Sequence, residues 1–207
     1  MSKLSSVLDG IPKLPTLPGD LNDTKNWGFT VYRTYYGPSS DENWDKLLTT
    51  AKREAIEEVM KWSDDESGEK LKPPFRLDDR SDVSLLSGVD RRGLIQIYND
   101  GIGGSPMPTR GPHVFLYADG EVLDQVSQGI FNLKAVGAEE ESREDIPPQE
   151  GDEDFGEPRY WGWMKIETRQ ILKLWGGLEW SHAECVIMWT ENQADLEEQV
   201  WDGWDAD

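Results

Sequence analysis

Residues 27–62 read WGFTVYRTYYGPSSDENWDKLLTTAKREAIEEVMKW. The first ten residues are rich in aromatic and β-branched side chains, a composition typical of a β-strand. A Gly-Pro pair then breaks the strand, and Ser39 and Glu42 have the spacing of a helix-capping box. Beyond it, apolar residues recur at three- and four-residue steps: Trp44, Leu48, Ala51, Ala55, Val59 and Trp62. This stretch predicts a strand over 27–36 and a helix over 42–62 that packs on the sheet.

Arg33 is the anomaly of the predicted strand, because alternation places it in the apolar row with Trp27 and Val31. One interpretation is a structural arginine at the edge of the core, satisfied by a carboxylate such as Asp78 or Asp79, or extended along its stem to water. The other is an anchor for an anion or substrate, since a guanidinium presents a planar fork to carboxylate or phosphate.

The remaining pattern predicts one α+β domain over residues 26–190. Strands are expected at 75–77, 113–118, 160–167 and 183–189, and helices at 89–99, at 121–128 and after Thr168 up to the Gly176-Gly177 pair. The simplest arrangement of this order is a mostly antiparallel sheet of four to five strands with helices packed on one face, ferredoxin-like in style. Residues 1–25 are expected to form an irregular N-terminal arm.

The formal net charge of −20 is concentrated in two segments. The acidic linker, residues 139–157, carries ten acids against one base, and the acidic C-terminal tail, residues 191–207, carries seven acids and no base. Such runs favour disorder, expected at 139–157 and 196–207, with Trp201 and Trp204 as groups that dock on a partner. The alternative is an acidic surface that attracts a basic partner. No basic stripe is present, so direct nucleic-acid binding is not expected.

The single cysteine, Cys185, excludes an internal disulfide and favours a reducing compartment, cytoplasmic or nuclear. It is expected to be buried in the strand 183–189. No apolar run approaches the length of a transmembrane helix, and no secretory signal is recognised at the N-terminus, so no membrane association is expected.

No motif for catalysis or metal binding is complete. His182 and Glu184 form half of a zinc-deaminase signature, but one cysteine and two histidines cannot supply the remaining ligands. Asp78, Asp79 and Asp82 fit an aspartate-stabilised turn better than a metal loop. No metal and no cofactor are therefore expected.

Tryptophan is abundant, with ten in the chain. Four of them surround one predicted strand-helix unit: Trp161, Trp163, Trp175 and Trp180. One interpretation is a core rich in aromatics, and the other is an aromatic groove for a ligand or a peptide.

Several segments resemble a known group of proteins. The segments WGFTVYRTYYG, DDRSDVSLLSGVDRRGLIQIY, HVFLYADGEVLDQV and GWMKIETRQILKLWGGLEW are similar to those of uncharacterised intracellular proteins of filamentous fungi, over roughly residues 27–180 without the acidic linker. The resemblance implies a shared fold and a fungal source, and it implies no activity. It also matches Asp119, and Arg91 or Arg92, to residues common in that group. The region after Trp180 departs from the group.

Two functions fit these observations. The first is a non-catalytic interaction module that engages a protein partner, either another protein or a second copy in a homodimer, through aromatic side chains and the acidic tail. The alternative is a small-ligand-binding protein or enzyme with an aromatic pocket that holds an anionic ring compound, built from Arg33, Tyr35, His113 and Trp163. The surroundings of Arg33 distinguish the two.

Overall fold

The computed structural model describes residues 26–62, 65–107, 113–138, 157–178 and 181–203 of the 207-residue chain. Their core is one six-stranded sheet in the order β2 (Phe75–Arg80), β1 (Trp27–Arg33), β3 (Val114–Ala118), β4 (Asn132–Gly137), β6 (Trp163–Glu167) and β8 (Val200–Trp201). A separate two-stranded sheet pairs β5 (Arg159–Tyr160) with β7 (Trp189–Thr190). The expected N-terminal arm and all but one residue of the acidic linker lie outside the described residues.

The strand directions confirm the α+β class but not the expected antiparallel sheet. β1 is parallel to β2 and to β3, and β8 is parallel to β6, whereas β4 is antiparallel to both of its neighbours. β4 therefore runs against the other five strands. The physical reason is that whole helices follow β1 and β2, and a helical crossover returns the chain in the same direction.

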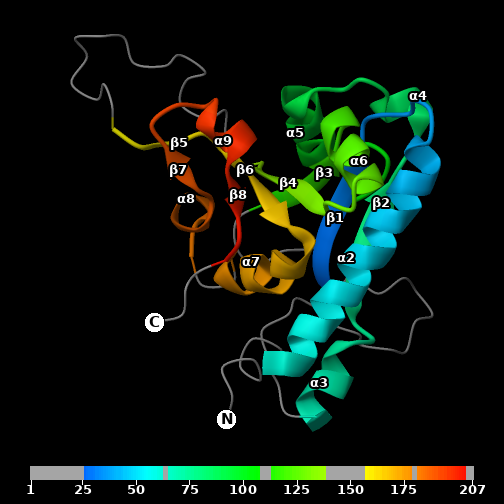
Figure 1. The fold of residues 1–207 in the computed structure, drawn as a ribbon, viewed down its shortest axis with the longest axis vertical. Helices are drawn as coiled ribbons and strands as arrows, with labels where there is room; N and C mark the ends of the chain where they lie inside the picture. Colours follow the sequence, from blue (N-terminus) through cyan, green and yellow to red (C-terminus); the bar gives the residue numbers. More distant parts are fainter. Residues whose placement is uncertain (1–25, 63–64, 108–112, 139–156, 179–180, 204–207) are drawn as a thin grey trace.

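Helices cover both faces of the sheet rather than one (Figure 1). On one face lie α2 (Ser40–Trp62), α6 (Gly120–Ser127) and α7 (Ile171–Leu178), where the ring of Trp175 is 5.4 Å from that of Trp27. On the other lie α4 (Val83–Leu86) and α5 (Arg91–Asn99), where the ring of Tyr98 is 5.2 Å from that of Phe115. The shorter elements are α3 (Asp65–Leu71), η1 (Thr168–Gln170), α8 (Ala183–Val186) and α9 (Asp195–Glu198).

β1 lies between β2 and β3 in the sheet, and all seven of its residues are buried. Alternation predicted one buried row, but a strand between two parallel neighbours and under helices on both faces has no solvent side. At Gly28, with φ of 128°, an added Cβ would lie 1.8 Å from the carbonyl oxygen of Arg76. Only glycine lets β1 approach β2 this closely.

α2 forms and ends at Trp62 as predicted, but it begins two residues earlier. It starts at Ser40. Ser39, the predicted capping residue, has φ of 59° and therefore lacks the extended backbone of a residue that caps a helix start. Trp44 is buried, as the apolar stripe predicted, while the side chain of Trp62 is 56% exposed. The last turn of α2 lies beyond the sheet, beside α3 (Figure 1), so Trp62 has no core to enter.

Several elements of the C-terminal half differ from the expectation. β4 was not predicted at all, and residues 183–189, expected as a strand, contain the helix α8 with Cys185 exposed. α7 continues through both glycines that were expected to end it. Residues 195–201 are ordered as α9 and β8, so the disorder expected from residue 196 onward is wrong for this segment. In the described part of the chain, no helix combines the length and apolar character needed to span a membrane.

Candidate functional site

Arg33 is buried and hydrogen-bonded to residues close to it in the chain. It is 4% exposed, and its guanidinium donates hydrogen bonds to the carbonyl of Tyr35 (2.9 Å), the hydroxyl of Ser40 (2.7 Å) and the carboxylate of Asp41 (2.5 Å). It also lies 4.5 Å from the ring centroid of Tyr36. The carboxylate that satisfies Arg33 therefore comes from the first turn of α2, and not from Asp78 or Asp79 as suggested by the sequence.

Tyr35 fills the space between the ends of β1 and β3. An added Cβ at Gly37 would lie 2.0 Å from the Tyr35 hydroxyl, and one at Gly120 would lie 3.3 Å from the Tyr35 ring. In open α/β sheets, the crevice between diverging loops at the carboxyl ends of two strands is a common ligand site. Here that crevice holds the Tyr35 side chain.

The four predicted ligand residues do not form one pocket. His113 is exposed and precedes β3, whereas Arg33 pairs in register with Ala118 at the other end of that strand. Along β3, five residues separate His113 from Ala118, the partner of Arg33, which is a distance of roughly 16 Å. Trp163 is buried at the start of β6, two strands away from β3 in the sheet.

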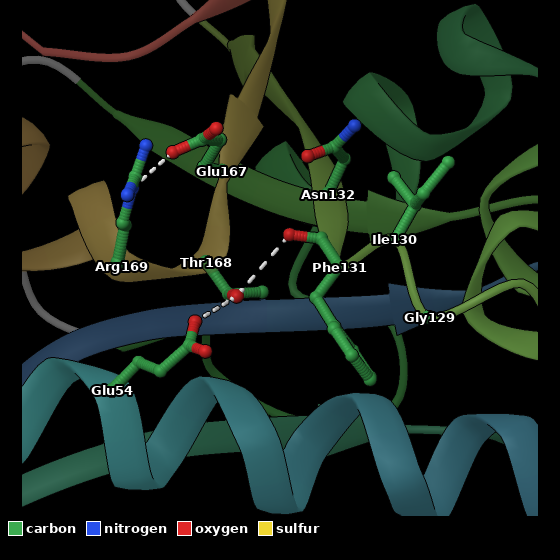
Figure 2. A pocket seen from close by; sticks show the side chains of 8 residues that line it. All are labelled: Glu54, Gly129, Ile130, Phe131, Asn132, Glu167, Thr168 and Arg169. Carbon is green, nitrogen blue, oxygen red and sulfur yellow. Dashed lines mark hydrogen bonds and ion pairs between the residues drawn. The ribbon is translucent and has the colours of Figure 1, made fainter.

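A hollow of about 270 Å³ lies where β4 begins and β6 ends. We call it the edge groove. It lies between α2 and the sheet and is lined by Glu54, Gly129, Ile130, Phe131, Asn132, Glu167, Thr168 and Arg169 (Figure 2). None of these residues was a sequence candidate, because they come from three separate parts of the chain.

The floor of the edge groove is polar. The buried hydroxyl of Thr168 lies 2.5 Å from a carboxylate oxygen of Glu54 and 3.2 Å from the carbonyl oxygen of Phe131. The other oxygen of Glu54 pairs with Arg53 on the outer surface of α2, and Glu167 pairs with Arg169. Figure 2 shows Glu54 and Glu167 on opposite sides of Thr168.

One wall of the edge groove is apolar. Ile130 is 45% exposed, and the ring of Phe131 is partly buried with the ammonium of Lys46 5.5 Å from its centroid. Both residues follow Gly129, which turns the chain from α6 into β4 with φ of 83°. The groove thus combines two carboxylates with exposed apolar surface.

A second cluster of charges lies on neighbouring strands of the same sheet. Its members, here named the ion cluster, are Lys134, Lys165, Asp119, Glu121 and Glu197. The two lysines are directly opposite each other on β4 and β6, and they are 5% and 2% exposed. Buried charges of this kind require partners, and the cluster supplies them from α6 and α9.

The ammonium groups share their carboxylates. Lys134 is 2.8 Å from both Asp119 and Glu121, and Lys165 is 2.5 Å from the other oxygen of Glu121. Burial by itself lowers the pKa of Lys134, but its hydrogen bonds to Asp119 and Glu121 outweigh burial and raise the pKa above the ordinary value. Lys134 therefore stays protonated at neutral pH and does not serve as an amine nucleophile.

The ion cluster borders two buried aromatic side chains. Trp163 is 2% exposed, with the ammonium of Lys134 5.6 Å and the guanidinium of Arg91 5.3 Å from its ring centroid. Its indole nitrogen has no hydrogen-bond partner among the described residues. Tyr117 faces Lys134 on the neighbouring strand, and burial raises the pKa of its phenol to about 12.

The sequence identified parts of this region without joining them. Asp119, Arg91 and Trp163 were each noted separately, whereas Lys134, Glu121 and Glu197 gave no signal. Trp161, Trp163 and Trp175 are core residues, which decides between the two interpretations of the tryptophan set for these three. Trp180 lies outside the described residues.

The remaining sequence candidates take structural positions. Asp78 and Asp79 belong to β2 and not to a turn, and Asp78 pairs with Arg80 at 2.7 Å. Asp82 caps α4 by accepting a hydrogen bond from the backbone of Ser84 at 2.9 Å. Across the described ranges, no group of three or more histidine, cysteine, aspartate or glutamate side chains could hold a metal ion.

Comparison of the chain with protein-family models, with curated proteins and with solved structures gives no match.

Proposed function

We propose that this chain is a non-catalytic interaction module that binds a basic segment of a protein partner in the edge groove. The observation that carries the proposal is the combination, in one open hollow, of exposed Ile130 with the carboxylates of Glu54 and Glu167. A lysine or arginine side chain has the matching chemistry, because its aliphatic stem covers apolar surface while its charged end reaches a carboxylate.

The size of the edge groove favours a side chain over a whole ligand. Its volume of about 270 Å³ is below the range of roughly 300–1,000 Å³ that is common for small-molecule sites. A side chain of a docked protein needs less enclosure, because the surrounding contact surface excludes water.

The carboxylates of the edge groove can exchange their present partners. Arg53 and Arg169 have side chains 54% and 57% exposed, and exposed ion pairs contribute only about 0–1 kcal/mol. Little free energy is therefore lost when a cation of the partner replaces either arginine at its carboxylate. The net charge of −20 adds long-range attraction for a basic partner.

The alternative function, an enzyme or small-ligand binder, has weaker support. It was to use Arg33 as an anion anchor, but the guanidinium already has three acceptors, one of them a carboxylate. Its remaining support is Trp163, which lies beside Arg91 and Lys134, where a small anion would compete with the carboxylates of the ion cluster.

The test is binding of a hexapeptide of alternating lysine and leucine, measured by calorimetry with wild-type protein and two variants. Glu54→Gln removes the groove charge but keeps an oxygen acceptor for Thr168, and should weaken binding about three- to tenfold. Glu57→Gln removes the same charge from an exposed position of α2 and should leave binding within twofold.

Equal losses in Glu54→Gln and Glu57→Gln would mean that the peptide senses only overall charge, and would contradict the proposal. Ile130→Ser gives a second comparison, because it removes the apolar wall without changing charge. Its matched control is Ile102→Ser, which alters an exposed isoleucine outside the groove.

A further inference from the structure

The C-terminal segment, residues 195–201, lies against β6 as a short bound peptide would. It consists of the four-residue α9 and the two-residue β8, with Val200 opposite Lys165 and Trp201 opposite Ile166 in a parallel pairing. The contacts of both elements with the rest of the fold are concentrated on β6. Figure 1 shows the segment at the outer edge of the sheet.

Three side chains anchor the C-terminal segment. Leu196 is fully buried and Trp201 is 8% exposed. Between them, the carboxylate of Glu197 lies 3.3 Å from the ammonium of Lys165 and 3.6 Å from that of Lys134. The backbone carbonyl of Glu197 also accepts a hydrogen bond from Lys165. One acidic residue thus meets both lysines.

The surface that receives the segment does not depend on it for charge balance. Without Glu197, Lys134 keeps Asp119 and Glu121 at 2.8 Å, and Lys165 keeps Glu121 at 2.5 Å. Departure of the segment therefore leaves no lysine without a carboxylate. It exposes the main-chain edge of β6, which is a template for another strand.

We infer that the β6 edge and the two lysines form a binding site for an acidic segment with the side-chain pattern Leu-Glu-x-x-Val-Trp, and that residues 195–201 of a second copy of this chain occupy it in trans. Main-chain pairing of an added strand supplies affinity, and the lysines and the buried apolar positions supply specificity. Exchange of an identical segment reproduces every contact, so it is a low-cost route to a dimer.

The connection to the segment suits such an exchange. Only residues 191–194 separate β7 from α9. A short hinge that opens carries the segment away from its own sheet and toward that of another copy. The second copy would then contribute Glu197 to the ion cluster of the first, in place of the Glu197 that the first chain supplies itself.

The first experiment uses a fluorescent peptide of residues 191–203, ENQADLEEQVWDG, and full-length protein. Glu197→Lys in the protein sets a cation against two lysines and releases its own segment, so the peptide should bind at least tenfold more tightly than to wild type. Wild type should bind weakly, because its own segment competes at the millimolar effective concentration of a tethered group.

Glu198→Lys is the matched control, since it makes the same charge change one residue away at an exposed position outside the ion cluster. Equal peptide affinity of the Glu197→Lys and Glu198→Lys proteins would overturn the inference. The peptide carrying Glu197→Lys should bind neither protein. If the Glu197→Lys protein fails to give a native near-ultraviolet circular dichroism spectrum, Trp201→Ala serves as the releasing variant with the same expected result.

Two further measurements identify the occupant. Citrate should not displace the peptide at equimolar concentration, and displacement would assign the site to small anions instead. Sedimentation should show that wild type dimerises as its concentration rises, that Glu198→Lys does so equally and that Glu197→Lys does not. A wild-type protein that remains monomeric throughout would overturn the second copy as the occupant.

Discussion

The two halves of the sheet bury cations in different ways. In the half formed by β2, β1 and β3, Arg33 finds its carboxylate eight residues further along the chain. In the half formed by β4, β6 and β8, Lys134 and Lys165 reach carboxylates 15 and 44 residues away, and Lys165 also reaches the Glu197 carbonyl 32 residues away. The first arrangement is a local cap on a helix start, whereas the second joins three distant elements.

The partners also differ in their contact with water. The side chain of Asp41 is 93% exposed, whereas those of Asp119 and Glu121 are 29% and 40% exposed. When its cation is removed, an exposed carboxylate is solvated by water and costs little free energy. A partly buried carboxylate is solvated less well and costs more. Similar burial of a cation therefore does not imply a similar contribution to stability.

The largest expected effect is that of Lys134→Ala. It leaves Asp119 with no lysine and leaves Lys165 as the one lysine beside both Glu121 and Glu197, so we expect a loss of about 3 kcal/mol of unfolding free energy. Urea denaturation measures it. A loss no greater than that of Arg33→Ala would break the comparison between the two halves.

Alkaline pH should act next most strongly, and through the ion cluster. The pKa of Tyr117 is raised to about 12 and that of Lys134 is also raised, so between pH 10 and 12 the folded state holds protons that the unfolded state has released. Stability should therefore be fully present below pH 10 and fall by about 2–3 kcal/mol as the pH rises to 12. Thermal unfolding over this range measures it, and Tyr117→Phe should flatten the dependence. An unchanged slope in that variant would contradict the assignment.

Arg33→Ala should cost less, about 1–2 kcal/mol, since the exposed Asp41 stays solvated while the hydrogen bonds to Tyr35 and Ser40 are lost. Chemical denaturation gives the value. Asp41→Asn provides the control, because it removes the charge but keeps an acceptor, and should change stability by less than the arginine variant. A larger loss in Asp41→Asn would show that the charge pair dominates.

The smallest expected effects are those of replacing two glycines, Gly176 and Gly37, by alanine. Gly176 lies within α7 with no atom within 4 Å of an added Cβ, so Gly176→Ala should stabilise the fold by about 0.5–1 kcal/mol. Gly37→Ala should destabilise it, because its Cβ would collide with Tyr35. Differential scanning calorimetry should show melting temperatures that move in opposite directions, and a shift of both in one direction would contradict the packing described for Tyr35.

The sequence predicted the half of the sheet around β1 better than the half around β4, and the candidate sites show why. β4 has the sequence NLKAVG, which is short, begins with a turn-forming residue and includes a lysine. It forms a buried strand because Lys134 meets carboxylates from α6 and α9, which no local pattern contains. The edge groove could not be predicted from local patterns for the same reason, since Glu54 and Thr168 are 114 residues apart.

Local sequence patterns were enough to predict the α+β class, the strand β1, the long helix α2 with Trp44 in its buried stripe, and the need of Arg33 for a carboxylate. These follow from periodicity and composition, which act over a few turns or strand residues. Local patterns did not predict the strand directions, the helices on both faces, the ion cluster or the docking of residues 195–201. Each of these depends on contacts between segments far apart in the chain, where the free energy of burial and charge pairing outweighs local preference.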